Sequence, residues 1–265
     1  MPVFLCVILS LVCAPAAAAA MISLPHGAGL TAGGAGMVAE IIDGDTVQLA
    51  DGRTLRLAGL YAPKSGVAGR QAAHRLTELA AGRPVRLFFA GLPRDRWRRV
   101  LAHLERGDGL WLQGALLAEG LARVQTRVQT RAETRAVASA MLHLEAAARR
   151  ARRGIWRNPA FAVRRADSLD RTARGFQIVE GRILRAQRIN GRVYLNFGAD
   201  WHTDFTVSLD AAARRRFVRA GLSPQHWSGR YIRVRGWIKN WNGPMIEATH
   251  PEQIEVLDGP DDFLF

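Results

Sequence analysis

The chain has 265 residues, of which 48% are hydrophobic and 23% are charged. That length allows one large or two small domains, and that composition excludes a chain that is disordered throughout. Lys and Arg together number 37 against 23 Asp and Glu, which gives a formal net charge of +14 and favours nucleic acid or another polyanion as the partner.

Residues 1–20 carry no charge. A short apolar run at residues 3–12 leads into a tract of alanines, which is typical of a secretory signal peptide, so we expect a secreted or periplasmic protein that begins near Met21. The apolar run is too short to span a bilayer, although an uncleaved anchor remains the alternative, and we expect no other membrane span. Both cysteines, Cys6 and Cys13, lie in this segment, so the rest of the chain has no disulfide and no thiolate metal ligand.

Residues 21–36 are small, rich in glycine and without a period, which predicts a flexible lead-in. The next segment, residues 37–156, begins with alternating apolar and polar residues between turn signals and later carries apolar residues at helical spacing. These patterns predict strands at 37–42, 45–50, 53–60, 84–90 and 98–105, and helices at 69–82, 110–123 and 133–154.

A polar, arginine-bearing stretch at residues 157–175 is predicted to be a linker. After it the sequence predicts strands at 176–187, 191–198, 204–209, 230–240 and 244–257, with a helix at 210–221. The Asn-Gly pairs at 190–191 and 242–243 stand where hairpin turns are expected. Five strands with one helix after the third is the order of an oligonucleotide-binding (OB) barrel, so residues 176–257 are predicted to form a second, smaller OB-like β-barrel. The acidic tail at 258–265 is expected to be loose.

Five short blocks follow one another within residues 37–156: IIDGDTVQL, RLAGLYAP, DRWRRVLAHL, ALLAEGLARV and EAAARRARRGIW. In these blocks the segment resembles the staphylococcal nuclease (thermonuclease) family. The resemblance implies an α+β domain, mainly β, with a five-stranded OB barrel and three helices. It also implies a Ca²⁺-dependent phosphodiesterase, in which the metal acts as a Lewis acid, a glutamate is the general base and two arginines bind the phosphate.

The resemblance assigns roles to four residues. Asp45 matches the metal-binding aspartate of the DGDT motif, and Asp43 matches the neighbour that supports it. Arg56 and Arg99 match the two phosphate-binding arginines, with Arg98 as the alternative register for the second. These side chains are expected either to bind phosphate or, as remnants of such a site, to stabilise the barrel.

Two positions depart from the family pattern. Tyr61 stands where the family has a metal-binding aspartate, and Lys64 stands where it has the general-base glutamate. A general base contributes about 10²–10⁴-fold to a rate, and a single carboxylate is a poor Ca²⁺ site. We therefore expect a pseudoenzyme without a resident cofactor, in which the Lys64 ammonium lies against Asp43 and Asp45. Ca²⁺ is expected only under the alternative, an active endonuclease that hydrolyses DNA or RNA with a rebuilt metal site.

The C-terminal segment carries basic and aromatic residues along its predicted strands. OB barrels bind single strands by stacking bases on aromatic side chains beside basic grooves. The nucleic-acid-binding candidates here are Arg192, Arg233, Arg235 and Trp241. The alternative is that aromatic residues at strand spacing fill the barrel core, and a structural or protein-binding module of the cell envelope remains a third possible function. The sequence leaves the oligomeric state open.

Overall fold

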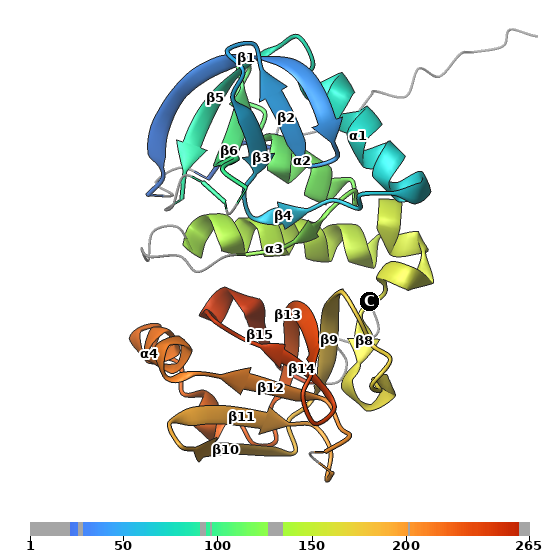
Figure 1. The fold of residues 1–265 in the computed structure, drawn as a ribbon, viewed down its shortest axis with the longest axis vertical. Helices are drawn as coiled ribbons and strands as arrows, with labels where there is room; N and C mark the ends of the chain where they lie inside the picture. The colour runs from blue at the N-terminus through green and yellow to red at the C-terminus, as the bar shows by residue number, and fades with distance from the viewer. Residues whose placement is uncertain are drawn as a thin grey trace, which may run out of the picture.

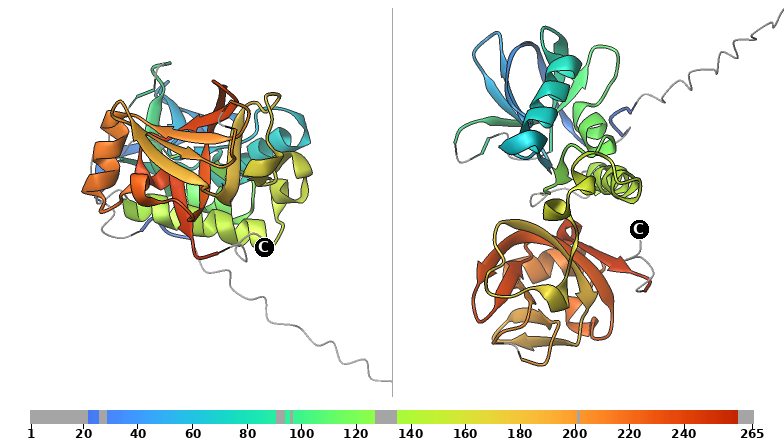
Figure 2. Two further views of the ribbon diagram at one scale, coloured as in Figure 1. Left: turned by 90° about the horizontal axis from the view of Figure 1, so that it is seen from below. Right: turned by 90° about the vertical axis from the view of Figure 1, so that its right-hand side faces the viewer.

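The computed structural model describes residues 22–25, 29–90, 94–95, 97–126, 135–200 and 202–259 (Figure 1). The predicted signal segment and most of the acidic tail lie outside these residues. Two lobes are stacked along the long axis of the molecule, as the side view in Figure 2 also shows. Within the described part of the chain, no helix combines the length and the apolar character needed to cross a membrane.

The upper lobe in Figure 1, here called the N-terminal domain, is built on a closed five-stranded barrel. Its strands are antiparallel neighbours except for β3 and β6, which run parallel. Around the barrel the strands follow in the order β1 (Thr31–Asp43), β2 (Thr46–Leu49), β3 (Thr54–Leu57), β6 (Val100–Arg106) and β5 (Pro84–Phe89). The barrel predicted from the sequence is therefore confirmed.

Three helices and a short ribbon complete this domain. They are α1 (Gly66–Ala80), α2 (Leu112–Ala118), α3 (Arg135–Arg150) and the pair β4 (Leu60–Tyr61) with β7 (Arg123–Val124). One apolar core fills the barrel and extends beneath α1 and α2, where side chains such as Leu55, Leu76, Leu104 and Leu116 are fully buried. In Figure 1, α3 lies along the bottom of the domain, between the two lobes.

The flexible lead-in predicted for residues 21–36 is wrong for much of the described part of that segment. Strand β1 begins at Thr31 and pairs with β5, and Leu24 is buried in the core. At Gly33 an added Cβ would lie 2.2 Å from the Phe89 ring, so the small residues allow the backbone itself to pack closely. A strand that packs through its backbone lacks the alternation of large apolar side chains from which strands are predicted.

The lower lobe, here called the C-terminal domain, contains one eight-stranded sheet and the helix α4 (Ala211–Arg219). The helix follows β12, as the predicted OB order requires. Strand β10 stands at one end of the sheet, and β9 stands near the other end. Only Ile183 and Leu184 separate these two strands in the chain, so the sheet must curve back on itself, as in an OB fold. The order across the sheet is β10 (Arg185–Ile189), β11 (Arg192–Asn196), β12 (Thr206–Leu209), β14 (Pro244–Glu247), β13 (Tyr231–Asn240), β9 (Phe176–Arg182) and β8 (Arg164–Arg165), with β15 (Ile254–Leu257) beside β13.

Short 3₁₀ helices shape the connections in and around this domain. They are η2 (Gly154–Arg157), η3 (Pro159–Phe161), η4 (Ala166–Ser168), η5 (Pro224–His226) and η6 (Pro251–Gln253). The linker predicted at 157–175 is wrong in its middle part, because β8 pairs with β9 and both Ala166 and Leu169 lie in the core of the C-terminal domain. Its polar composition reflects arginines on the surface of an ordered segment.

An apolar cluster joins the two domains. Ala148 of α3, with Ile155 and Trp156, packs against Phe176 and Ile178 of β9. Every one of these side chains is buried. The domains therefore share a small core of their own in addition to the two main cores.

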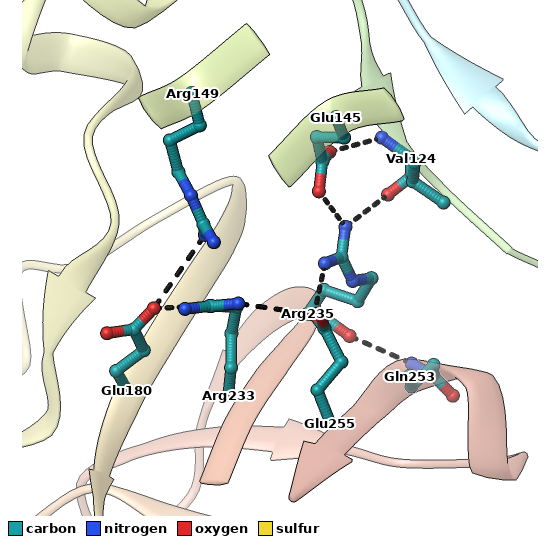
Figure 3. A network of polar contacts seen from close by, with 8 residues as sticks. All are labelled: Val124, Glu145, Arg149, Glu180, Arg233, Arg235, Gln253 and Glu255. Carbon is teal, nitrogen blue, oxygen red and sulfur yellow. Dashed lines mark hydrogen bonds and ion pairs between the residues drawn. The ribbon is translucent and has the colours of Figure 1, made fainter. Parts of the chain in front are cut away.

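Buried ion pairs reinforce this contact (Figure 3). Arg235 of β13 lies 2.6 Å from a carboxylate oxygen of Glu145 on α3 and 2.6 Å from one of Glu255 on β15. Arg233 pairs with Glu180, which also faces Arg149 of α3 at 3.7 Å. Burial alone would lower the pKa of Arg235, but Glu145 and Glu255 raise it above its ordinary value, so the guanidinium is charged.

The expectation that Arg233 and Arg235 bind nucleic acid is therefore wrong. Their side chains are only 6% and 2% exposed, because the face of β13 that carries them is covered by α3 of the N-terminal domain. Strand alternation predicted the shared face correctly. It could not predict that another domain covers that face.

Candidate functional site

The site starts at the tight turn that joins β1 to β2. Gly44 lies in this turn between Asp43 and Asp45, and a Cβ at Gly44 would come within 2.6 Å of the Ala72 Cβ on α1. Only glycine allows the helix to approach the turn so closely. The Asp45 N–H donates to Asp43 Oδ1 over 2.9 Å, which fixes the two aspartates relative to each other.

Asp45 is completely buried and has several partners. Its Oδ2 accepts a hydrogen bond from the Ala62 N–H at 3.0 Å, and its Oδ1 accepts one from the Thr46 hydroxyl at 3.1 Å. Arg56 Nε lies 3.4 Å from Asp45 Oδ1. A buried carboxylate needs such partners, because burial of an unpaired charge is strongly unfavourable.

Lys64 provides the remaining charge. Its ammonium lies 2.9 Å from Asp43 Oδ1 and also forms a short ion pair with Asp45 Oδ1, as the sequence predicted. Burial alone would raise the pKa of the Asp43 carboxyl, but the hydrogen bonds from Lys64 and from the Asp45 N–H outweigh it, so this pKa lies below its usual value. Both aspartates are thus compensated by a side chain of the chain itself.

The donor set does not fit Ca²⁺. This ion needs six or more oxygen ligands, several of them carboxylates. Here the oxygens of Asp45 are already bonded to the Ala62 N–H, the Thr46 hydroxyl and the Lys64 ammonium. Across the described residues, no three His, Cys, Asp or Glu side chains are grouped so that they could hold a metal ion.

The second arginine is positioned by an aspartate that the sequence analysis did not select. Asp95 Oδ2 accepts hydrogen bonds from the Arg99 guanidinium at 2.8 Å, and its Oδ1 accepts the N–H groups of Trp97 and Arg99. Burial would raise the pKa of Asp95, but the hydrogen bonds from Arg99 lower it below its ordinary value. The signal that could have identified Asp95 is its spacing of four residues from Arg99 across a short turn.

Arg56 and Arg99 line one pocket of about 820 Å³. Arg98, the alternative register, does not line it and instead borders a neighbouring hollow of about 450 Å³ together with Arg53 and Arg94. Trp97 and Arg99 border both, so the two depressions adjoin. Among the described residues, the larger pocket is lined by Arg56, Tyr61, Lys64, Trp97, Arg99, Gln125 and Trp237.

A comparison with protein-family models bears on this geometry. The model described as "Staphylococcal nuclease homologue" matches residues 54–158, from β3 to just beyond the Gly-Ile-Trp turn. The N-terminal domain is a staphylococcal nuclease homologue domain. No curated protein matches the chain. The Asp43–Asp45 turn precedes the matched segment, whereas Arg56, Arg99 and both departing positions lie within it.

Tyr61 has a structural role in this nuclease homologue domain. Its ring lies 6.3 Å from that of Phe176 and 6.1 Å from that of Trp237, measured between centroids, and the last two rings are 6.0 Å apart. Phe176 and Trp237 belong to the C-terminal domain. Tyr61 therefore packs at the domain boundary, at a position where the resemblance implies a metal ligand.

The other C-terminal candidates lie away from the pocket. Arg192 is half-buried and pairs with Glu247 at 3.4 Å, and Trp241 is 73% exposed beside its hairpin turn. Neither lines the pocket. Among the described residues of this domain, Trp237 of β13 does line the pocket, and the sequence analysis did not select it.

Proposed function

We propose that this protein is an exported, nuclease-like protein that binds nucleic acid through its phosphates and does not hydrolyse it efficiently. The observation that carries the proposal is the position of Lys64, whose ammonium lies against Asp43 and Asp45. Arg56 and Arg99 line the adjoining pocket. The arginines that the resemblance assigns to phosphate are thus present, while Tyr61 and Lys64 stand at one metal-ligand position and at the position of the base.

The chemistry of the pocket residues supports binding without hydrolysis. Hydrolysis needs a group that accepts a proton from the attacking water, and a lysine ammonium is a donor only. Tyr61 packs against two aromatic rings and brings no carboxylate. Arginine, by contrast, donates two parallel hydrogen bonds to phosphate oxygens and needs no metal to do so.

The test combines a binding assay with a cleavage assay on the purified protein. Labelled DNA should bind, and the affinity should fall as the salt concentration rises, because arginine contacts release counterions from the phosphates. Arg99→Gln should weaken binding by about tenfold or more, since a hydrogen bond to a charged group contributes about 1.5–3 kcal/mol. Arg215→Gln, which removes the same charge from the exposed face of α4, is the matched control.

Cleavage is measured with the same DNA in Ca²⁺ and in a chelator. We expect no Ca²⁺-dependent product. Rapid cleavage that requires Ca²⁺ would contradict the proposal and support the active endonuclease. Affinity that is unchanged by salt would exclude binding through phosphates.

Export is proposed from the uncharged apolar segment at residues 3–12 and the alanines that follow it. N-terminal sequencing of the protein from the cell exterior or periplasm should return a chain that begins near Met21. A chain that still begins at Met1 would favour the uncleaved anchor.

A further inference from the structure

The geometry points to Trp237 of the C-terminal domain as a base-stacking residue of the phosphate pocket. The pocket would then be a joint site of both domains, and it would take one nucleotide of a single strand, with the phosphate at Arg56 and Arg99 and the base on Trp237. This inference rests on the proposed function and deepens it, because it names the part of the ligand that the second domain binds.

Trp237 is both exposed and fixed. It is 51% exposed and lines the pocket, while Tyr61 and Phe176 contact it at near-perpendicular angles of 80° and 70°. A ring that is packed on one side and open on another loses little further freedom when a ligand stacks on it. A core residue would be covered on all sides, which Trp237 is not.

The charged and aromatic sides of the pocket suit the two ends of a nucleotide. Arg56, Arg99 and Lys64 come from the N-terminal domain, and Trp237 comes from β13 of the other domain. A volume of about 820 Å³ lies within the ordinary range for small-molecule sites. Aromatic side chains stack on bases that are unpaired, because the faces of paired bases are covered by their neighbours.

The domain contact keeps the two sides of the pocket together. Arg235 of β13, two residues before Trp237, forms a buried ion pair with Glu145 of α3. The apolar cluster around Ile155 and Phe176 packs beside the same strand end. The position of Trp237 relative to Arg56 is therefore set before any ligand binds.

The adjoining hollow offers a path for the next part of the strand. Arg53, Arg94 and Arg98 border it, and it shares Trp97 and Arg99 with the pocket. Trp97 is 56% exposed, with the Arg99 guanidinium 5.0 Å from its ring centroid. A strand that leaves the pocket across Trp97 would bring its following phosphates to these arginines.

The experiment measures the affinity for a labelled oligothymidylate, for a duplex of equal length and for inorganic polyphosphate. Trp237→Ala should weaken oligothymidylate binding by about tenfold or more, because a base stacked on an aromatic ring contributes about 1–3 kcal/mol. The same variant should bind polyphosphate within about twofold of the unaltered protein, because polyphosphate has no base. Trp237→Phe retains an aromatic face and should restore most of the affinity. Trp241→Ala, which removes a more exposed tryptophan just beyond the end of the same strand, is the control and should change nothing.

A competition assay on the unaltered protein tests the same point without a substitution. Thymidine 5′-phosphate should displace the oligothymidylate at a lower concentration than deoxyribose 5-phosphate, because only the former has a base. Equal competition would overturn the inference, as would a duplex that binds as tightly as the single strand or a Trp237→Ala protein with unchanged affinity. If the unaltered protein binds neither oligothymidylate nor polyphosphate, the proposed function itself is overturned. If it binds both and Trp237→Ala leaves the oligothymidylate affinity unchanged, only the inference is overturned.

Discussion

Lys64 and Arg56 together bring two positive charges to the two negative charges of Asp43 and Asp45. The cluster is therefore neutral with no metal ion in it. The distances of 2.9 Å from Lys64 to Asp43 and 3.4 Å from Arg56 to Asp45 are within the range of ion pairs. Replacement of a basic partner by a neutral residue would leave a carboxylate in this cluster without its compensating charge.

Lys64→Met should lower the free energy of unfolding at pH 7 by about 1–3 kcal/mol, because Asp45 is buried and loses a charged partner. The folded-state pKa of Asp43 lies below the reference value of 3.8, so its contribution is complete above that pH and is lost as the pH falls through the folded-state value. The difference between the two proteins should therefore shrink below about pH 3.8. Urea unfolding at pH 7 and pH 3 measures both effects.

Arg53→Met is the matched control for this prediction. Arg53 pairs with Asp51 on the surface, where both side chains are partly exposed, and such pairs contribute about 0–1 kcal/mol. A loss at Lys64 no larger than that at Arg53 would show that the aspartate cluster does not need the ammonium.

Lys64→Glu should create a Ca²⁺ site of low affinity, because it places a third carboxylate beside Asp43 and Asp45 and removes the repelling ammonium. Dissociation constants of about 10⁻⁴–10⁻³ M are typical of weak oxygen sites. Calorimetric titration measures it, with Lys239→Glu as the control for charge alone. The double variant Tyr61→Asp with Lys64→Glu should bind more tightly. The absence of binding in both would mean that the turn cannot accept the ion.

Strand β13 carries the residues by which the C-terminal domain contacts the N-terminal domain and lines the pocket. Its odd-numbered residues share one face, and they pass from the covered arginines Arg233 and Arg235 to Trp237 at the pocket. One strand face thus supplies both the domain contact and a wall of the pocket.

Arg235→Met should destabilise the protein by about 3–5 kcal/mol, because it leaves the buried Glu145 without its ion-pair partner and removes one of the two arginines that face Glu255. Arg192→Met removes a half-exposed pair and should cost less than about 1 kcal/mol. Thermal and urea unfolding of the two variants measure the difference. Equal losses would mean that the ion pairs at the domain boundary are as solvated as a surface pair.

The elements that the sequence predicted well are those whose pattern is local. The barrel strands show alternation between turn residues, and Asn190 and Gly191 have the positive φ of 47° and 81° that a tight hairpin turn requires. Asp45, Arg56, Lys64 and Arg99 lie in short motifs and were found. Trp237 joins them only through tertiary packing, and the cover over Arg235 comes from a helix about 90 residues earlier, so neither has a local signal.

For the whole molecule, the shared apolar cluster and the buried ion pairs predict that the two domains unfold together. Interfaces between domains are often small and polar, and domains joined in that way unfold separately. Here Ile155, Trp156 and Phe176 are buried in the contact. Scanning calorimetry should show one transition. Two separate transitions in the unaltered protein would contradict this.

Two buried histidines should make the stability of the whole chain depend on pH. Burial lowers the pKa of His103 to about 4, and burial with the nearby Arg216 lowers that of His250 to about 4. The unfolded chain takes up these protons near pH 6.5, so the free energy of unfolding should fall as the pH decreases from about 6.5 to about 4. Urea unfolding across this range measures the slope.

His250→Gln removes one of the titrating groups while it retains a side chain that can bond to Thr126 and Thr249. The slope between pH 6.5 and pH 4 should become shallower in this variant. His143→Gln, which makes the same substitution on the exposed side of α3, is the matched control. Equal slopes in all three proteins would contradict the assignment of neutral, buried histidines.

The packing of the Tyr61 ring constrains how a carboxylate could be introduced at this position. The ring packs on Phe176 and Trp237, so residue 61 is part of the contact between the two domains. Tyr61→Asp would therefore add a possible metal ligand and at the same time remove aromatic contacts that hold the domains together. The single substitution would therefore weaken the contact between the domains. Compensating changes at Phe176 or Trp237 would have to come before, or together with, the carboxylate.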